Sequence, residues 1–552
     1  MIRPAGAMKI RILDVVVALL AAVTLGEWLS QAVGPWDWDI DHMMYFGDRL
    51  LAGEFHWTRE FDDKLPVLQI LFALPAAVGS VAAWRWMALA LMVMGAAATW
   101  HVMDDMARRG GMQAAGDRRR YGALAAVTSL YAATFMPGGI HHINAPAAAC
   151  AITALSLLIQ SRRVQSGRIW TRKGRGGALL FAVSAFAASL AIGMRPYFLL
   201  PLVLGAGWIC LRDTPLRSLV RVAIWPVALT AIWTGLVGAW GLLVNFVPYV
   251  ALGQTDAFFA GMAMFGQTLN PQTTADTLHE LRLAVARLPS PLSEMILLAA
   301  AACFYAVYTV LAGRRLSPPP SEAPLSAPPP TAAHRRLCLD TAVLVFCLPA
   351  LLLLAILQRH FWAHYLQMFS PFLGLGLAVF AVLLRDIVTR ETPHYRRLGG
   401  GLVLATALIF AVPALLADLA VATGPRAPAP GARTTEAVAA ALADLPEDRR
   451  AFLFLDDMAP HWRLHAPRHG FPHAANSYQV INLGWWSAVD MPAHFAHPVT
   501  AGGYCTALTQ DGPPVIFAGP TLSAFAEACL SRSPDYRLHG HINDGRIAVY
   551  TR

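Results

Sequence analysis

The side chains best suited to chemistry gather in one stretch near the start of the chain, from Pro35 to Pro66. This stretch follows a long apolar run, and its carboxylates are Asp37, Asp39, Asp41, Asp48, Glu54, Glu60, Asp62 and Asp63. The 552-residue chain has only 34 acidic residues, so this density is unusual. Because charge beside a bilayer is costly, the stretch is either a loop solvated among headgroups or a reaction centre that needs a carboxylate base.

Isolated polar residues stand at the ends of apolar runs elsewhere in the chain. They are Lys64, His141, His142, Asn144, Arg195, Asp256, Arg359, His360 and His364. Arginine binds phosphate through two parallel hydrogen bonds, and lysine acts there as a point charge. Together with the acidic stretch, the set could combine a base with cations for a phosphate. The simpler alternatives are a helix cap at Asp39 and cations that extend toward the headgroups.

The composition indicates an integral membrane protein with several spans. The sequence is 56% hydrophobic and 14% charged, whereas soluble domains carry roughly 25% charged residues. The net charge of +9 comes from Lys and Arg in short loops between apolar runs. That distribution orients spans and gives no reason to expect a nucleic-acid partner.

The basic loops divide the chain into about eleven spans and place the N-terminus in the cytoplasm. The predicted spans are residues 12–33, 84–106, 121–136, 145–159, 178–194, 197–211, 222–244, 295–312, 337–357, 365–384 and 402–421. Leu65 to Ser80 is apolar but short, and Pro66 and Pro75 interrupt it, so we expect it not to cross. This topology puts the acidic loop and the isolated polar residues on the outer face. The Pro-rich linker, residues 316–333, lies on the cytoplasmic side.

The last part of the chain predicts a small α/β domain outside the membrane. A linker, residues 423–433, leads to this domain, residues 434–552. Apolar runs at 451–456 and 514–519 predict buried strands, and residues 434–445 and 521–530 predict helices, the first capped by Thr434 or Thr435. The final residues predict a hairpin that turns at Asn543-Asp544-Gly545. Cys505 and Cys529 could pair in an oxidising compartment.

Four histidines in this region recur at intervals of four residues, at His461, His465, His469 and His473. A helix with this period would present a metal-binding face. Prolines and a glycine interrupt the segment, so we interpret these residues as loop histidines. The adjacent pair His141-His142 predicts a hydrogen-bonded loop more than a metal site.

Three motifs, in order, resemble the GT-C membrane glycosyltransferases. DIDHMMYFGDRLLAGEFHW and FDDKLPVLQILFALP are similar to the first outer loop of the protein O-mannosyltransferase and aminoarabinose-transferase-like branch. Asp39 falls on the family's Asp by its spacing to Gly53, and Lys64-Leu65-Pro66 on its Lys-Pro-Pro. AIGMRPYFLLPL resembles a Gly-x-x-x-Lys-Pro run, with Arg195 in the Lys place, and HYLQMFSPFLGLGLA a His-Tyr-(x)n-Pro run.

The chain departs from the family pattern at two acidic positions. Ile40 stands where Glu is common, and Asn144 lies near the place of a second outer-loop acid. An amide cannot act as a base, so the second acidic role would pass to His141, His142 or Asp256.

The resemblance implies a polytopic α-helical fold and a glycosyltransferase of the bacterial inner membrane. It implies transfer, with inversion, from a polyprenyl-phosphate-linked sugar to an envelope glycan, lipid or protein at the periplasmic face. Asp39 would be the base, with Asp41 as the next candidate; Lys64, Arg195 and Arg359 would bind the donor phosphate. Expected acceptor or positioning residues are Tyr45, His141, His142, Asn144, Asp256, His364 and Tyr365. No cofactor is required, although a divalent metal is compatible with the chemistry.

The alternative class is a membrane transporter or a flippase for lipid-linked sugars. Transporters place ionisable residues near the bilayer midplane on broken helices. Here the predicted span interiors are almost free of charge, which favours the enzyme.

Overall fold

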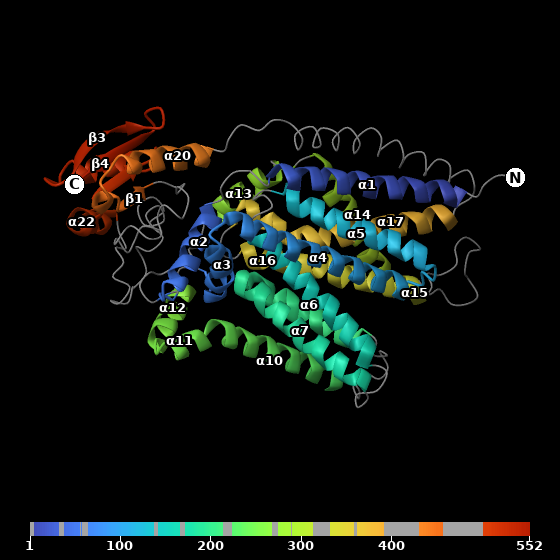
Figure 1. Ribbon diagram of the computed structural model, residues 1–552. Helices are drawn as coiled ribbons and strands as arrows, with labels where there is room; N and C mark the ends of the chain where they lie inside the picture. Colours follow the sequence, from blue (N-terminus) through green and yellow to red (C-terminus); the bar gives the residue numbers. More distant parts are fainter. Residues whose placement is uncertain are drawn as a thin grey trace, which may run out of the picture. The chain divides into compact units, whose positions relative to one another are not determined.

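The computed structural model describes residues 5–31, 38–55, 57, 64–136, 142–165, 172–212, 224–267, 274–286, 288, 290–312, 332–357, 361–390, 430–455 and 501–552. The chain forms two compact units. Unit 1 comprises residues 1–30, 88–241 and 272–424, and unit 2 comprises residues 31–87, 242–271 and 425–552. Figure 1 shows a helical chain with a small sheet near its C-terminus.

Unit 1 is helical throughout its described residues. Its elements are α1 (Ala5–Gln31), most of α4 (Val81–Arg109), α5 (Ala115–Phe135), α6 (Asn144–Gln165), α7 (Arg172–Met194), η1 (Pro196–Phe198), α8 (Leu199–Leu211), most of α10 (Ile224–Asn245), α13 (Thr274–Ala286), α14 (Ser290–Ala312), α15 (Ala332–Asp340), the π-helical η3 (Thr341–Cys347), α16 (Leu348–Leu357), η4 (Ala363–Phe369) and α17 (Ser370–Arg390). Helix α6 is buried on nearly every side and packs along α7, as Figure 1 also shows.

Small residues allow the helices of unit 1 to approach closely. Gly95 of α4 faces Ala149 of α6, and Gly374 of α17 lies against the backbone oxygen of Ala125 in α5. A side chain at either glycine would collide with the neighbouring helix. Close packing of small residues is how membrane helices associate without a hydrophobic driving force.

Seven helices among the described residues are long and apolar enough to cross a membrane. They are residues 82–109, 144–164, 175–194, 224–251, 291–311, 332–357 and 363–385. Each contains one of the spans predicted from sequence, apart from differences of a few residues at the ends. The predicted span 197–211 forms a shorter apolar helix, residues 12–33 and 121–136 fall largely on α1 and α5, and residues 402–421 lie outside the described part. The chain is therefore a polytopic helical membrane protein.

In unit 2, the first described helices are α2 (Trp38–Leu51) and α3 (Pro66–Val78), followed later by α11 (Val247–Ala251) and α12 (Thr255–Gln267). Pro66 occupies the first turn of α3, and Gly79 ends the helix with a positive φ of 71° and bonds to the Pro75 and Ala76 carbonyls. Helix α3 has 13 residues, about 20 Å at 1.5 Å per residue. That is shorter than the roughly 30 Å of bilayer hydrocarbon. Because α8, which the sequence predicts to span, also has 13 residues, the prediction that α3 does not span stays a prediction.

Helices α2 and α3 touch through a glycine. A Cβ on Gly47 would lie 2.5 Å from the backbone oxygen of Phe72. Phe72 is itself fully buried and stacks on Trp84, with ring centroids 4.0 Å apart. The two backbones therefore approach each other more closely than any side chain at position 47 would permit.

We expect Gly47→Ala to destabilise the protein by about 1–3 kcal/mol, the usual cost of overpacking. The obstructing atom belongs to the backbone and cannot rotate away. Thermal unfolding in detergent measures the effect. The matched control is Gly238→Ala in α10, an exposed helical glycine where a Cβ meets no atom within 4 Å, so its stability should change little. A Gly47→Ala variant as stable as wild type would contradict the close approach.

The C-terminal region of unit 2 forms a four-stranded sheet of order β1-β2-β4-β3. The strands are β1 (Phe452–Leu455), β2 (Val515–Ala518), β3 (Arg537–Ile542) and β4 (Ile547–Thr551), and the helices are α20 (Pro430–Ala443), η6 (Glu447–Arg449), α22 (Ala501–Asp511) and α23 (Ser523–Leu530). Strands β1 and β2 are parallel, and the other pairs are antiparallel.

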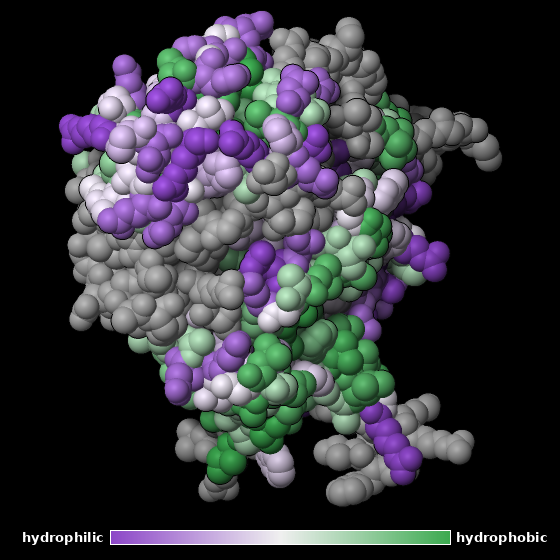
Figure 2. All heavy atoms as spheres, turned by 60° about the vertical axis from the view of Figure 1, so that its left-hand side comes forward, coloured by the Kyte–Doolittle hydropathy of each residue, from purple (hydrophilic) through white to green (hydrophobic). Residues whose placement is uncertain are grey.

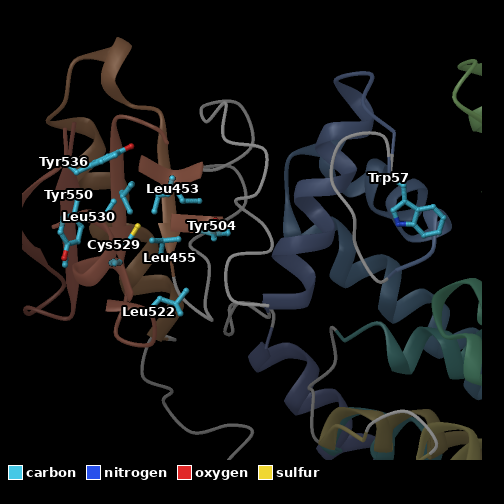
Figure 3. Packing of buried hydrophobic residues seen from close by; sticks show 14 of the residues in the cluster. Trp57, Leu453, Leu455, Tyr504, Leu522, Cys529, Leu530, Tyr536 and Tyr550 are labelled. Atoms are coloured by element: carbon cyan, nitrogen blue, oxygen red, sulfur yellow. The ribbon is translucent and has the colours of Figure 1, made fainter. Parts of the chain in front are cut away.

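The strands β1, β2 and β4 alternate between two hydrophobic cores. Phe452, Phe454 and Phe517 pack with α20 on one face. Leu453, Leu455 and the alternate residues of β2 and β4 pack with α22 and α23 on the other face, which Figure 3 shows in part. Both faces of these strands are covered, so nearly all of their residues are apolar. These continuous apolar runs are why the sequence predicted buried strands at these places. Figure 2 shows mainly hydrophilic residues on the outside of this domain and hydrophobic ones over the apolar helices.

The predicted hairpin is confirmed: β3 and β4 pair, and Asn543, Asp544 and Gly545 all have positive φ. Cys505 of α22 and Cys529 of α23 form a disulfide.

One prediction for this domain needs correction, and one helix was missed. Helix α20 begins at Pro430, inside the predicted linker, so Thr434 and Thr435 lie within the helix instead of capping it. Helix α22 was not predicted, because its Gly502-Gly503 pair disfavours a helix and only tertiary packing of Tyr504 and Leu508 supports it.

Candidate active site

In unit 1, Asn144 connects three segments that are far apart in sequence. Its side-chain oxygen accepts a hydrogen bond from Nε of Arg195, and its amide nitrogen donates to the carbonyl of His364 at 2.9 Å. Its backbone N–H donates to Nδ1 of His142 at 3.3 Å. Asn144 is fully buried. We call His142, Asn144, Arg195, His364 and Tyr365 the Asn144 cluster.

Three aromatic rings stack in this cluster. The His142 and His364 rings lie 4.1 Å apart, and the ring of Trp362, which neighbours the cluster, stacks on His364 with centroids 6.5 Å apart. Nδ1 of His142 is the acceptor of the hydrogen bond from the Asn144 N–H. His142 is buried, whereas His364 and Trp362 are half-buried.

Arg195 lies at the junction of α7 and η1, where Pro196 ends the preceding helix. Its guanidinium carbon is 5.4 Å from the ring centroid of Tyr365, a cation–π distance. Tyr197 contacts the same ring at 5.7 Å. Arg195 is only 7% exposed, so it is a buried cation held by oriented polar and aromatic groups and not a side chain that extends to headgroups.

The remaining described candidates belong to unit 2. Asp39 and Asp41 lie in the first turns of α2, with their side chains outside the described part, and Tyr45 is buried on the same helix. Lys64 is half-buried and lies two residues before the start of α3. Because α2 and α3 pack on each other, the sequence's acidic helix and its lysine are on adjoining elements. Asp256 is exposed in the first turn of α12, where a carboxylate complements the helix dipole.

The loop after α2 is anchored by aromatic residues. Phe55 packs edge-on against Tyr249 at 4.5 Å, and Trp57 lies 6.1 Å from Phe258. Trp57 is fully buried, and Gly261 of α12 leaves the room for its indole ring. The sequence analysis treated this part of the stretch only as a motif and missed its role in holding the loop.

Several predicted residues lie outside the described part of the chain: Arg359, His141, His360 and the four histidines from 461 to 473. Among the described residues, no three His, Cys, Asp or Glu side chains are placed to hold a metal ion together.

The opposite end of unit 1 contains a buried ion-pair network that the sequence analysis missed. Asp105 of α4, with 1% of its side chain exposed, pairs with Arg163 of α6 and with Arg212 after α8. Asp340 of α15, also fully buried, accepts from Nε of Arg109 at 2.8 Å. We call these five residues the Asp105 network.

Two neighbours complete the network. Trp208 donates to Asp340 at 2.9 Å. Arg163 donates to Nε2 of His101 at 3.2 Å, and the other ring nitrogen lies 3.0 Å from the Ser156 hydroxyl. Since arginine only donates, Nε2 accepts and Nδ1 carries the proton. The available signal was the adjacent pair Asp104-Asp105 near the end of an apolar run, where a buried carboxylate needs a partner.

The two polar clusters lie at opposite ends of the same helices. Helix α6 begins at Asn144 and carries Arg163 near its other end; α7 ends beside Arg195, and α8 returns to Arg212. The alternation predicted for these helices is therefore present in the fold. Within unit 1, the described candidates His142, Asn144, Arg195 and His364 meet at one end of these helices, and the Asp105 network lies at the other.

Comparison with known proteins identifies the fold. No protein-family model matches the sequence, and no curated protein matches it. ArnT from Cupriavidus metallidurans, solved bound to undecaprenyl phosphate, superposes with a TM-score of 0.53 at 12% identity, covering 97% of this chain and 98% of that one. The oligosaccharyltransferase AglB from Archaeoglobus fulgidus, solved with an inhibitory peptide and a dolichol-phosphate, gives 0.51 at 11% identity, covering 92% and 71%. Both are GT-C membrane glycosyltransferases, and the chain described here has the GT-C fold.

Proposed function

We propose that this protein transfers a sugar from a polyprenyl-phosphate donor to a cell-envelope acceptor at the periplasmic face of the inner membrane. The observation that carries the proposal is the fold, which follows ArnT over nearly the whole of both chains. ArnT and AglB were both solved with a polyprenyl phosphate bound. The ordered motifs supply this chain's own candidates for the base and for the phosphate-binding cations.

The proposed chemistry divides among the candidate residues. Asp39 accepts the proton of the acceptor hydroxyl as it attacks the anomeric carbon, and the sugar–phosphate bond breaks with inversion. The lipid phosphate leaves with an extra negative charge. Lys64, Arg195 and Arg359 stabilise that charge, and a cation in a water-poor site is most effective in this role.

The disulfide supports a periplasmic position for the C-terminal domain. Cys505 and Cys529 are bonded, and disulfides persist in oxidising compartments such as the periplasm. Within the apolar helices the described cysteines, such as Cys150 and Cys210, remain free thiols. Labelling cysteines introduced at Gly111 and Gly431 from each side of the membrane tests the topology, which requires the two positions to react from opposite sides.

Purified protein supplied with polyprenyl-phosphate sugars should release polyprenyl phosphate in the presence of membrane acceptors. Mass spectrometry of envelope glycans and glycolipids from a deletion strain should identify the missing sugar and its acceptor. Protein that exchanges lipid-linked sugar across liposomes but never transfers it would instead support the transporter class. The buried carboxylates Asp105 and Asp340 lie near helix ends and are fully paired with arginines, unlike the midplane sites of transporters.

Arg195→Gln is expected to raise the donor KM or Kd by roughly 10–100-fold, because a charge-assisted hydrogen bond contributes about 1.5–3 kcal/mol. Titration with polyprenyl phosphate measures the binding change directly, without turnover. The control is Arg175→Gln, an exposed arginine near the other end of the same helix. Equal donor binding by the Arg195→Gln variant and wild type would remove Arg195 from the phosphate site.

A further inference from the structure

Gln69 of α3 is a buried amide that contacts two parts of the preceding helix. Its nitrogen donates to the carbonyl of Phe46 at 2.9 Å and to that of Glu54 at 3.1 Å, and the residue is 1% exposed. A buried amide is tolerated only when such partners are present. Gln69 therefore has a fixed orientation set by α2.

The two carbonyl acceptors belong to the middle of α2 and to a residue just after its end. Phe46 is in the middle of α2, one to two turns after Asp41 and Asp39. Glu54 follows Gly53, whose φ of 86° ends the helix, and its N–H bonds back to the Arg49 carbonyl at 2.9 Å. One side chain thus connects the body and the end of the helix that carries the aspartates.

Gln69 itself belongs to α3, the helix that follows Lys64. Gln69 lies in the second turn of α3, and the N–H of Val67, in the first turn, donates to the side chain of Asn245 at 2.9 Å. The close contact of Gly47 with Phe72 fixes the same pair of helices one turn further on. The start of α3 is therefore held by α10 through Asn245, and by α2 through Gln69 and Gly47.

We propose that Gln69 is a positioning residue, which sets the separation between the aspartates of α2 and Lys64 before α3. This inference rests on the proposed function, in which these groups act as base and phosphate cation. A glycosyl transfer needs the base and the leaving phosphate at a defined distance across the sugar. Misplacement of reacting groups by about 1 Å can cost about 100-fold in rate.

Gln69→Leu removes both hydrogen bonds while keeping a buried side chain of similar volume. We expect kcat to fall about 10–100-fold per folded molecule, with the donor KM within about twofold of wild type, because the geometry of reaction changes more than ground-state binding. The control is Thr99→Val. Thr99 is fully buried and bonds only within its own helix, to the Gly95 carbonyl at 2.8 Å, so its loss should lower stability with kcat unchanged.

A distance measurement tests the inference without turnover. Spin labels replace Leu51 of α2 and Leu74 of α3, which are 53% and 64% exposed, in a protein whose free cysteines have been substituted. In Gln69→Leu the label–label distance should shift or broaden, and in Thr99→Val it should remain as in wild type. An unchanged distance, or an unchanged kcat in active protein, would overturn the inference. Wild-type protein without any transferase activity would contradict the proposed function, and the distances would still decide whether Gln69 holds the two helices.

Discussion

Asp39→Asn is expected to lower sugar transfer by roughly 10²–10⁴-fold, the usual effect of losing a general base. The amide keeps the size and hydrogen-bonding capacity of the carboxylate but cannot accept the proton of the acceptor hydroxyl. Donor binding should change little, because the proton moves only in the chemical step. Turnover of folded, detergent-stable protein and donor binding by titration are the measurements.

Asp41→Asn is the matched comparison, since both residues lie at the start of α2. We expect the smaller loss at Asp41, which on the proposed mechanism only supports the loop. If Asp41→Asn abolishes transfer and Asp39→Asn does not, the two aspartates exchange roles. If neither substitution matters, the base lies elsewhere, and Asp256 is the next residue to substitute.

Asp105→Ala should destabilise the protein by about 3–5 kcal/mol, the cost of leaving buried charge without its partner. Arg212 has only 4% of its side chain exposed, and it and Arg163 both pair with this carboxylate. Arg212 cannot reach water without displacing the ends of α4 and α8, whereas Arg163 has 32% of its side chain exposed. Equilibrium unfolding in mixed micelles measures the loss.

Two variants distinguish this network from an ordinary ion pair. Asp14→Ala breaks a half-exposed pair with Arg120 at the same end of unit 1 and should cost at most about 1 kcal/mol. Combining Asp105→Leu with Arg212→Leu should recover part of the stability, because an apolar pair carries no desolvation cost. A loss below about 1 kcal/mol for Asp105→Ala would mean that solvent reaches the network.

The sequence by itself determined the class of protein and the positions of most helices. Spans such as 145–159 and 178–194 were predictable because a bilayer demands long apolar runs, and basic loops gave their alternation. The strands of the small domain were predictable for a related reason: burial on both faces makes them continuously apolar, as at 452–455 and 515–518. The three motifs led to the GT-C fold, which the structural comparison confirms.

Tertiary structure alone decided which polar residues meet. Asn144 gave no sign that it would hold Arg195 and the His364 carbonyl, because a hydrogen bond across 51 or 220 positions leaves no local pattern. Gln69 looked like one polar residue in an apolar helix. Its two carbonyl partners exist only because Gly47 lets α2 and α3 come into contact.

For the charged residues, too, the sequence indicated less than the folded chain shows. Asp104 and Asp105 stand side by side near the end of an apolar run, and nothing in the sequence indicated that Asp105 would receive arginines from two other segments. The periodicity and composition of a segment reflect which of its own faces are buried, so they constrain that segment alone. The position of a buried donor relative to its acceptor depends on helix packing, which is set by the shapes of many side chains together, and so it could be seen only in the folded chain.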